Sequence, residues 1–197
     1  MIDPLLSLAF ALHGMRGGYA LLLGSGVSRS AGIPTGWEIV GDLIRKLAHL
    51  QEADCEPDPE AWYVKKYKRP ATYDQILNAV AKSPTQRSQL LRAYFEPSET
   101  ERGGGLKMPT RAHHAIASLV RDGYIRVIVT TNFDRLIEQA CESAGISPAV
   151  ISTADAVEGA LPISHSRCTI VKLHGDYLDT RIKNTESELA SYDPRLD

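Results

Sequence analysis

A short apolar run that passes directly into a glycine- and serine-rich segment constrains the fold of this chain more than any other feature. Residues 19–23 are apolar and of strand length, and residues 24–34 follow at once with the sequence Gly-Ser-Gly-Val-Ser-Arg-Ser-Ala-Gly-Ile-Pro. Glycines let a backbone approach a phosphate closely, serine hydroxyls can donate to it, and a following helix presents N–H groups and the positive end of its dipole. The sequence therefore predicts a strand, a phosphate-binding turn and a helix, with a nucleotide as ligand.

Two further apolar runs end in polar residues in the same way. Residues 125–129 precede Thr130-Thr131-Asn132-Phe133-Asp134, and residues 168–171 precede Lys172-Leu173-His174-Gly175-Asp176. Helical patterns separate the apolar runs, and strands that alternate with helices favour an α/β fold with a Rossmann-like, doubly wound parallel sheet. Such sheets bind ligands at the carboxyl ends of their strands, where all three polar phrases are expected to lie.

The spacing of apolar residues predicts the remaining elements. We expect helices over 3–15, 37–50, 73–81, 86–95, 110–121, 133–143 and 155–160, and strands over 19–23, 125–129, 148–153 and 168–173. The polar stretch 51–70 is expected to be a loop or a small insertion and the glycine-rich stretch 96–109 a flexible loop, so that residues 51–109 form a helical insertion after the first strand–helix unit. We expect residues 1–197 to form a single domain, and because the polar tail 177–197 offers no further strand, a fragment of a longer chain.

Charge and composition argue against several classes of protein. The net charge is −2, with 22 basic and 24 acidic residues, so direct binding of nucleic acid or of a membrane surface is not expected. The three cysteines are widely spaced without a C-x-x-C pair, which predicts neither a disulfide framework nor a metal site. The apolar stretch 5–12 is too short to span a bilayer and follows no basic residues, so we expect a cytoplasmic protein.

Each polar phrase also has a purely structural interpretation. The glycine phrase could be a tight turn without a ligand, because Arg29 stands where a strict G-x-G-x-x-G motif has its last glycine. Asn132 could cap the helix that is predicted to start at Phe133, and His174 could be a turn histidine with satisfied hydrogen bonds. Capping alone gives no reason for the three phrases to occur together.

Two other features favour structural roles. His113 and His114 are adjacent on a predicted helix, so their side chains point to different faces and a shared metal ion is not expected. Trp37 is expected to pack in the core through its helix.

Taken together, the three phrases resemble the Sir2 (sirtuin) family of NAD-consuming proteins. The glycine phrase resembles the opening motif of that family, Asn132-Phe133-Asp134 resembles its Asn–hydrophobic–Asp triplet, and His174-Gly175 resembles its His-Gly, in the family's order. The resemblance implies that His174 is a general base for a ribose hydroxyl or water, that Asn132 holds the nicotinamide ribose and the attacking water, and that Asp134 recognises the nicotinamide carboxamide. The residues implied for binding the pyrophosphate of NAD are Gly24, Ser25, Gly26 and Ser28.

The chain departs from the protein-deacylating sirtuins in two places. Those proteins read Asp-Phe-Arg after Ile-Pro, whereas this chain reads Thr35-Gly36-Trp37. The resemblance implies that the missing phenylalanine would shield the reactive sugar from water, and that Gly36 in this chain favours hydrolysis. The four-cysteine zinc module of the deacylases is also absent from the sequence, which has three scattered cysteines.

Both departures resemble the Sir2-like domains of bacterial anti-phage defence, which destroy NAD in infected cells. The resemblance implies an NAD glycohydrolase that produces nicotinamide and ADP-ribose without a metal ion. It also implies a homo-oligomer, with a defence partner such as a HerA-like ATPase or a short Argonaute. Two alternatives are an NAD-dependent protein deacylase or ADP-ribosyl transferase, and a non-catalytic module that binds NAD or ADP-ribose within an assembly.

Overall fold

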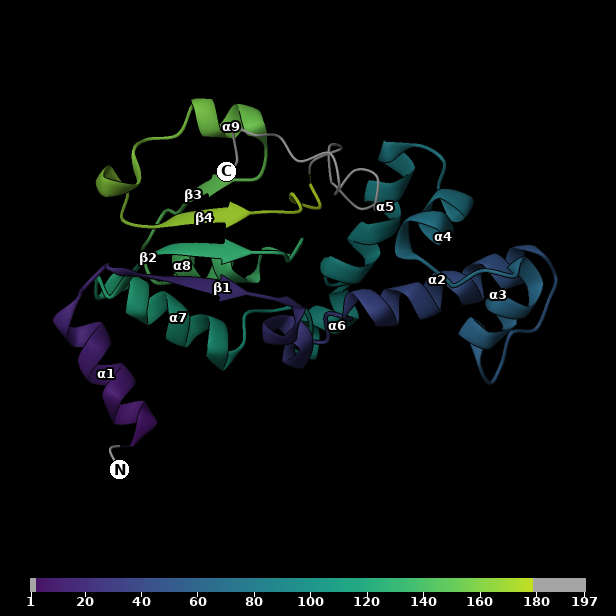
Figure 1. Ribbon diagram of the computed structural model, residues 1–197, viewed down its shortest axis with the longest axis horizontal. Helices are drawn as coiled ribbons and strands as arrows, with labels where there is room; N and C mark the ends of the chain where they lie inside the picture. Colours follow the sequence, from purple (N-terminus) through teal and green to yellow (C-terminus); the bar gives the residue numbers. More distant parts are fainter. Residues whose placement is uncertain (1–2, 179–197) are drawn as a thin grey trace.

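The computed structural model describes residues 3–178 and is built around a four-stranded parallel sheet (Figure 1). The strands are β1 (Tyr19–Leu23), β2 (Ile125–Thr130), β3 (Ala149–Ile151) and β4 (Thr169–Lys172), in the spatial order β1-β2-β4-β3. The chain therefore leaves β2, forms the outer strand β3 and returns to place β4 in the middle. Helices alternate with these parallel strands, which confirms the predicted Rossmann-like α/β class.

The helices largely follow the predicted apolar periodicity. They are α1 (Pro4–Gly14), η1 (Ser25–Ala31), α2 (Gly36–Leu50), α3 (Pro59–Tyr67), α4 (Tyr73–Val80), α5 (Pro84–Phe95), α6 (Glu99–Gly103), α7 (Arg111–Arg121), α8 (Leu136–Ser143), α9 (Ala154–Glu158) and η2 (Ile163–His165). Within the described residues, no helix is long and apolar enough to cross a membrane.

Two predicted loops contain short helices instead. In α3, the side chain of Asp58 accepts a hydrogen bond from the N–H of Ala61, and a proline occupies the first turn. In α6, the side chains of Ser98 and Glu101 cap each other's backbone N–H groups. The prediction of loops was wrong here because local capping, and not an apolar stripe, marks these two helices.

The buried apolar residues form two cores. Helices α7 and α8 pack on one face of the sheet, around residues Ala117, Val120, Ile125, Ile128, Ile137, Ala140, Cys141, Ile146, Cys168 and Ile170. The second core joins α2, α3, α4 and α5, and it also contains Leu136 and Tyr177. Figure 1 shows the carboxyl ends of the strands directed toward this helical part of the molecule.

The other face of the sheet is less well covered by the described residues. Leu22 of β1 pairs in register with Val129 of β2, which pairs with Val171 of β4. Leu22 is 74% exposed, and within the described range β1 has only β2 as a neighbouring strand. Helix α1 is apolar, yet none of its residues is buried. An apolar parallel sheet is normally covered on both faces, so β1 and α1 offer surface for further packing.

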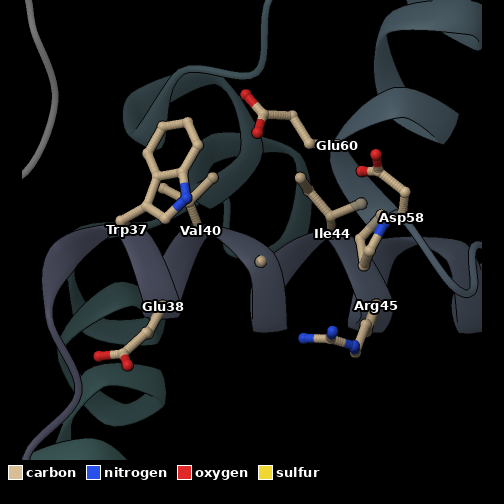
Figure 2. Close-up of a pocket in the computed structure, with 9 residues that line it drawn as sticks. Trp37, Glu38, Val40, Ile44, Arg45, Asp58 and Glu60 are labelled. Carbon is tan, nitrogen blue, oxygen red and sulfur yellow. The ribbon is translucent and has the colours of Figure 1, made fainter.

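A pocket of about 320 Å³ lies between α2 and the start of α3 (Figure 2). Trp37, Glu38 and Glu60 all line it, and in Figure 2 Trp37 and Glu60 lie on one side of α2 and the side chain of Glu38 on the other. The prediction that Trp37 packs in the core was wrong, because its side chain is 64% exposed at the rim of this pocket. The pocket contains none of the three polar phrases.

Candidate functional site

The three polar phrases start at the same level of the sheet. Leu23, the last residue of β1, pairs with Thr130 of β2, and Thr130 pairs with Lys172 of β4. The register continues into the turns, because the N–H of Leu173 donates to the carbonyl of Thr130 at 2.9 Å. The segments that follow β1, β2 and β4 therefore emerge side by side from adjacent strands.

The glycine phrase forms a short 3₁₀-helix, η1, and the longer helix expected over 37–50 follows it as α2. Gly32, at its end, has a φ of +78°, and a Cβ there would lie 3.2 Å from the side chain of Leu106, so this position has a structural need for glycine. Gly24 has a φ of −111° and Gly26 has no positive φ. No described atom lies within 4 Å of a Cβ at either position. Neither conformation nor packing requires these two glycines, and the open space allows a ligand to approach the backbone.

Asn132 lies at the end of β2 with its carboxamide only partly used. Its Nδ2 donates to Ser28 Oγ at 3.4 Å, and its backbone N–H donates to Thr130 Oγ1 at 3.0 Å. Its Oδ1 is buried and has no hydrogen-bond partner among the described residues. The interpretation that Asn132 caps the next helix is wrong: α8 starts at Leu136, and Oδ1 of Asp134 accepts the N–H of Leu136 at 3.0 Å.

Ser28 is fully buried beneath Asn132, and its hydroxyl also lies 3.4 Å from Nε2 of His113. The backbone N–H of Thr110 donates to Nδ1 of His113 at 3.2 Å, so Nδ1 is the acceptor and Nε2 carries the proton. Burial lowers the pKa of His113, which favours this neutral form, although the charge of Asp134 opposes the shift. Ser28 Oγ thus accepts from two side chains and keeps its own hydrogen for another acceptor.

His174 follows β4 and is half-buried beside the Asn132 turn. Its ring centroid lies 6.1 Å from that of Phe133, and its side chain forms a hydrogen bond with the backbone of Thr131. Burial lowers the pKa of His174, and the Thr131 contact opposes this shift in part. A neutral imidazole at pH 7 can accept a proton.

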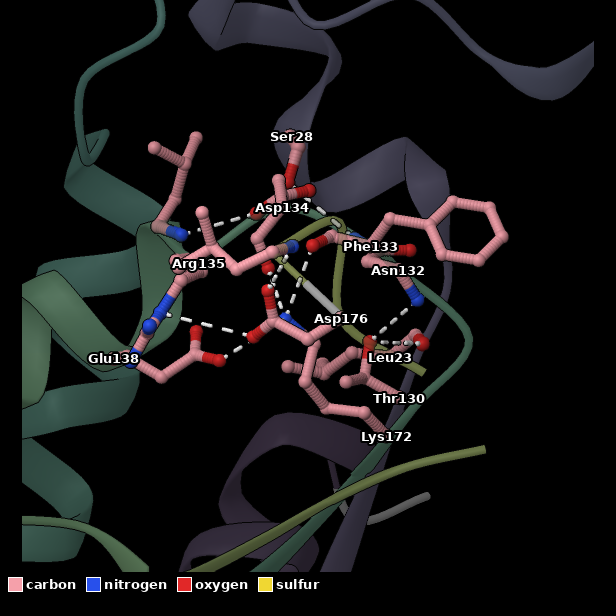
Figure 3. A network of polar contacts seen from close by, with 12 residues as sticks. Leu23, Ser28, Thr130, Asn132, Phe133, Asp134, Arg135, Glu138, Lys172 and Asp176 are labelled. Carbon is pink, nitrogen blue, oxygen red and sulfur yellow. Dashed lines mark hydrogen bonds and ion pairs between the residues drawn. The ribbon is translucent and has the colours of Figure 1, made fainter. Parts of the chain in front are cut away.

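A buried ionic network lies directly below these turns (Figure 3). The ammonium of Lys172 contacts carboxylate oxygens of Glu138 at 3.1 Å and of Asp176 at 3.0 Å. Arg135 Nε lies 3.7 Å from the same oxygen of Asp176. Burial raises the pKa of Glu138, and the charge of Lys172 opposes this shift.

Sequence reasoning did not identify His113, Lys172 or Glu138 as site residues. Lys172 ends an apolar strand and Glu138 lies among the apolar residues of α8. A charged residue inside an apolar pattern is a sequence signal that could have indicated this network. His113 was separated from the strand-end phrases in the sequence, and only the fold brings it to Ser28.

The cysteines and acidic residues do not form a metal site in the described part of the chain. Cys55, Cys141 and Cys168 are buried free thiols. Between residues 3 and 178, no group of three or more His, Cys, Asp or Glu side chains could hold a metal ion.

Comparison with known proteins identifies one family. Residues 126–195 match a family described as SIR2-like domain, and no curated protein matches the sequence significantly. The matched region includes Asn132, Asp134 and His174, whereas the glycine phrase precedes it. The match to residues 126–195, together with the alignment of the three phrases along one edge of the sheet, supports a Sir2-like assignment, and Sir2-like domains use NAD.

Proposed function

We propose that this chain is an NAD glycohydrolase, which uses water to cleave NAD into nicotinamide and ADP-ribose. The observation that carries the proposal is the buried Oδ1 of Asn132, which lacks a partner among the described residues at the carboxyl edge of the sheet. An unsatisfied buried oxygen costs about 1–3 kcal/mol, so such an atom is expected where a ligand supplies the missing donor. A ribose hydroxyl or the attacking water can be that donor.

His174 is the proposed general base. The bond between C1′ of the ribose and the nicotinamide nitrogen breaks, and its electron pair leaves with nicotinamide. The oxygen of water forms the new bond to C1′, and the proton of that water passes to the neutral imidazole of His174. The lowered pKa of His174 keeps the ring in its accepting form at neutral pH. Asp134 is proposed to recognise the nicotinamide carboxamide.

The proposed phosphate-binding residues divide into two groups. Gly24, Ser25 and Gly26 lie on the turn after β1, where the space over both glycines is open among the described residues. Ser28 is buried under Asn132, so its placement favours a role in orienting the Asn132 carboxamide over direct contact with the pyrophosphate.

Gly36 favours hydrolysis over transfer to a protein substrate. It begins α2 after Thr35, whose side chain caps the helix with Glu38. No described atom lies within 4 Å of a Cβ at this position, which leaves room for water near the turn. From the resemblance of its motifs to those of bacterial defence domains, we propose that hydrolysis depletes NAD during phage infection and that the protein works in the cytoplasm as a homo-oligomer.

The test is to incubate the purified chain with NAD and to quantify nicotinamide, with and without an acyl-lysine peptide. We expect release that does not depend on the peptide. His174→Ala should lower the rate by at least about 100-fold, the usual contribution of a general base. The matched control is His165→Ala, because His165 is exposed and lies before the start of β4.

Two results would contradict the proposal. Release that requires the peptide would favour a deacylase. Binding of NAD in calorimetry without nicotinamide release would favour a non-catalytic binding module.

A further inference from the structure

The buried ammonium of Lys172 is bonded to the turn that carries Asn132 (Figure 3). The side chain of Lys172 is 0% exposed. Its Nζ donates to the carbonyl of Phe133 at 3.1 Å and to the carbonyl of Asp134 at 2.6 Å. These carbonyls belong to the two residues that directly follow Asn132. The ammonium therefore fixes the backbone of the turn that carries Asn132.

The same ammonium holds the turn that carries His174. Nζ of Lys172 donates to Oδ2 of Asp176, two residues beyond His174, at 3.0 Å. The N–H of Tyr177 donates to the carbonyl of Phe133 at 3.3 Å, which adds a direct link between the two turns. Lys172 therefore lies at the point where both turns meet, on the strand that leads into His174.

Stability alone is a weak reason for a buried ion at this place. Lys172 faces two buried carboxylates, Glu138 and Asp176, and among residues 3–178 the partly exposed Arg135 is the one other cation in an ion pair with them. The free-energy cost of desolvating such groups often cancels the gain from pairing them. Apolar residues of similar size commonly give a fold of equal or greater stability. An apolar side chain, however, could not bind carbonyls and a carboxylate from two turns at once.

We infer that Lys172 is a positioning residue, which fixes the Asn132 carboxamide relative to the His174 imidazole without touching NAD. This inference rests on the proposed hydrolysis for its kinetic consequence. Misplacement of a reacting group by about 1 Å can cost about 100-fold in rate. Loss of Lys172 should therefore lower kcat far more than it raises KM.

The main test is the double variant Lys172→Met/Glu138→Gln. Lys172→Met alone would leave the Glu138 carboxylate buried without its cation. The double variant removes both charges of this pair, keeps the side-chain sizes and leaves Asp176 with Arg135 as its cation. We expect kcat to fall by about 100-fold and KM to change by less than about threefold. We also expect hydrogen exchange of the Tyr177 amide to accelerate by at least about tenfold, because this amide bonds to the turn that Lys172 holds.

A second buried lysine provides a matched control. Lys107 donates to the carbonyls of Ala93 and Glu96 and pairs with Glu101, and none of these bonds is to the Asn132 or His174 turn. Lys107→Met/Glu101→Gln should lower the melting temperature by a similar amount and leave kcat within about twofold of the wild type.

Asp176→Asn keeps the test decisive if the double variant does not fold. An asparagine can still accept the N–H of Leu178, as Oδ1 of Asp176 does, but it weakens the contact with Lys172. We expect this variant to fold, to lose kcat and to exchange the Tyr177 amide faster.

The two ways of failing are distinguishable. A wild-type chain that binds NAD but releases no nicotinamide would contradict the proposed function, and the exchange measurement would still decide the role of Lys172. A folded variant at Lys172 or Asp176 with unchanged Tyr177 exchange, or with kcat within threefold of the wild type, would overturn the positioning role.

Discussion

At the scale of single residues, the direction of each hydrogen bond decides what Asn132 can do. The neutral His113 donates from Nε2 to Ser28, which also accepts from Asn132. This arrangement holds Nδ2 of Asn132 toward the protein and leaves Oδ1 for a ligand. We therefore propose that the buried histidine influences the site through Ser28.

His113→Leu should therefore lower nicotinamide release by about tenfold, because Ser28 loses one donor and no longer holds the carboxamide in one orientation. The matched control is His114→Leu, since His114 is the exposed neighbour on the same helix. Rates and melting temperatures should be measured for both variants. Equal rates in the two variants would contradict a role for His113 in the site.

The pH dependence of kcat/KM should report the His174 base. The reaction requires neutral imidazole, so activity is lost as the pH falls through the pKa of His174. Because burial lowers this pKa from its usual value of 6.5, the acid limb should lie below pH 6.5. A rate profile from pH 4 to 8 checks this expectation, and an acid limb above pH 6.5 would exclude His174 in this environment as the base.

At the scale of elements, the glycines around η1 separate ligand binding from folding. Gly26→Val should weaken NAD binding and leave the melting temperature nearly unchanged, because its Cβ would enter open space that we assign to the ligand. Gly32→Ala should leave NAD binding nearly unchanged and lower the free energy of unfolding by about 1–2 kcal/mol, because Gly32 has a φ of +78°. Calorimetry and thermal unfolding measure the two effects, and unaltered NAD affinity in Gly26→Val would contradict phosphate binding at this turn.

Elements with a strong apolar periodicity in the sequence were predicted accurately, and features that depend on side-chain contacts were not. The strong apolar periodicity of α2 and α7 predicted both helices to within a residue of each end. Helix α8 was expected to begin at Phe133 but begins at Leu136. The side chain of Asp134 accepts the N–H of Leu136, so residues 133–135 form a turn before the helix. The positions of Asn132 and His174, just beyond β2 and β4, could be predicted because both residues follow apolar strands. Lys172 could not, because only tertiary contacts show that its charge is buried between two turns.

At the scale of the whole molecule, apolar surface is concentrated at the start of the chain. Helix α1 is apolar on all sides, and a helix of this kind is normally buried. Strand β1 adds the exposed Leu22 on the less covered face of the sheet. These surfaces support the proposal that further copies of the chain pack here in a homo-oligomer.

Phe10→Glu/Leu22→Lys should therefore shift the protein toward the monomer, because charged side chains would be buried in the contact at a high desolvation cost. The matched control is Leu161→Glu, since Leu161 is 67% exposed, close to the 68% of Phe10, but lies between α9 and η2. Light scattering coupled to size-exclusion chromatography measures the mass of each form. We expect the wild type and the control to share one oligomeric mass and the double variant to be smaller. A monomeric wild type at micromolar concentration would show that α1 and β1 do not mediate self-association, because an interface of standard size, about 800 Å² on each partner, would hold the copies together under those conditions.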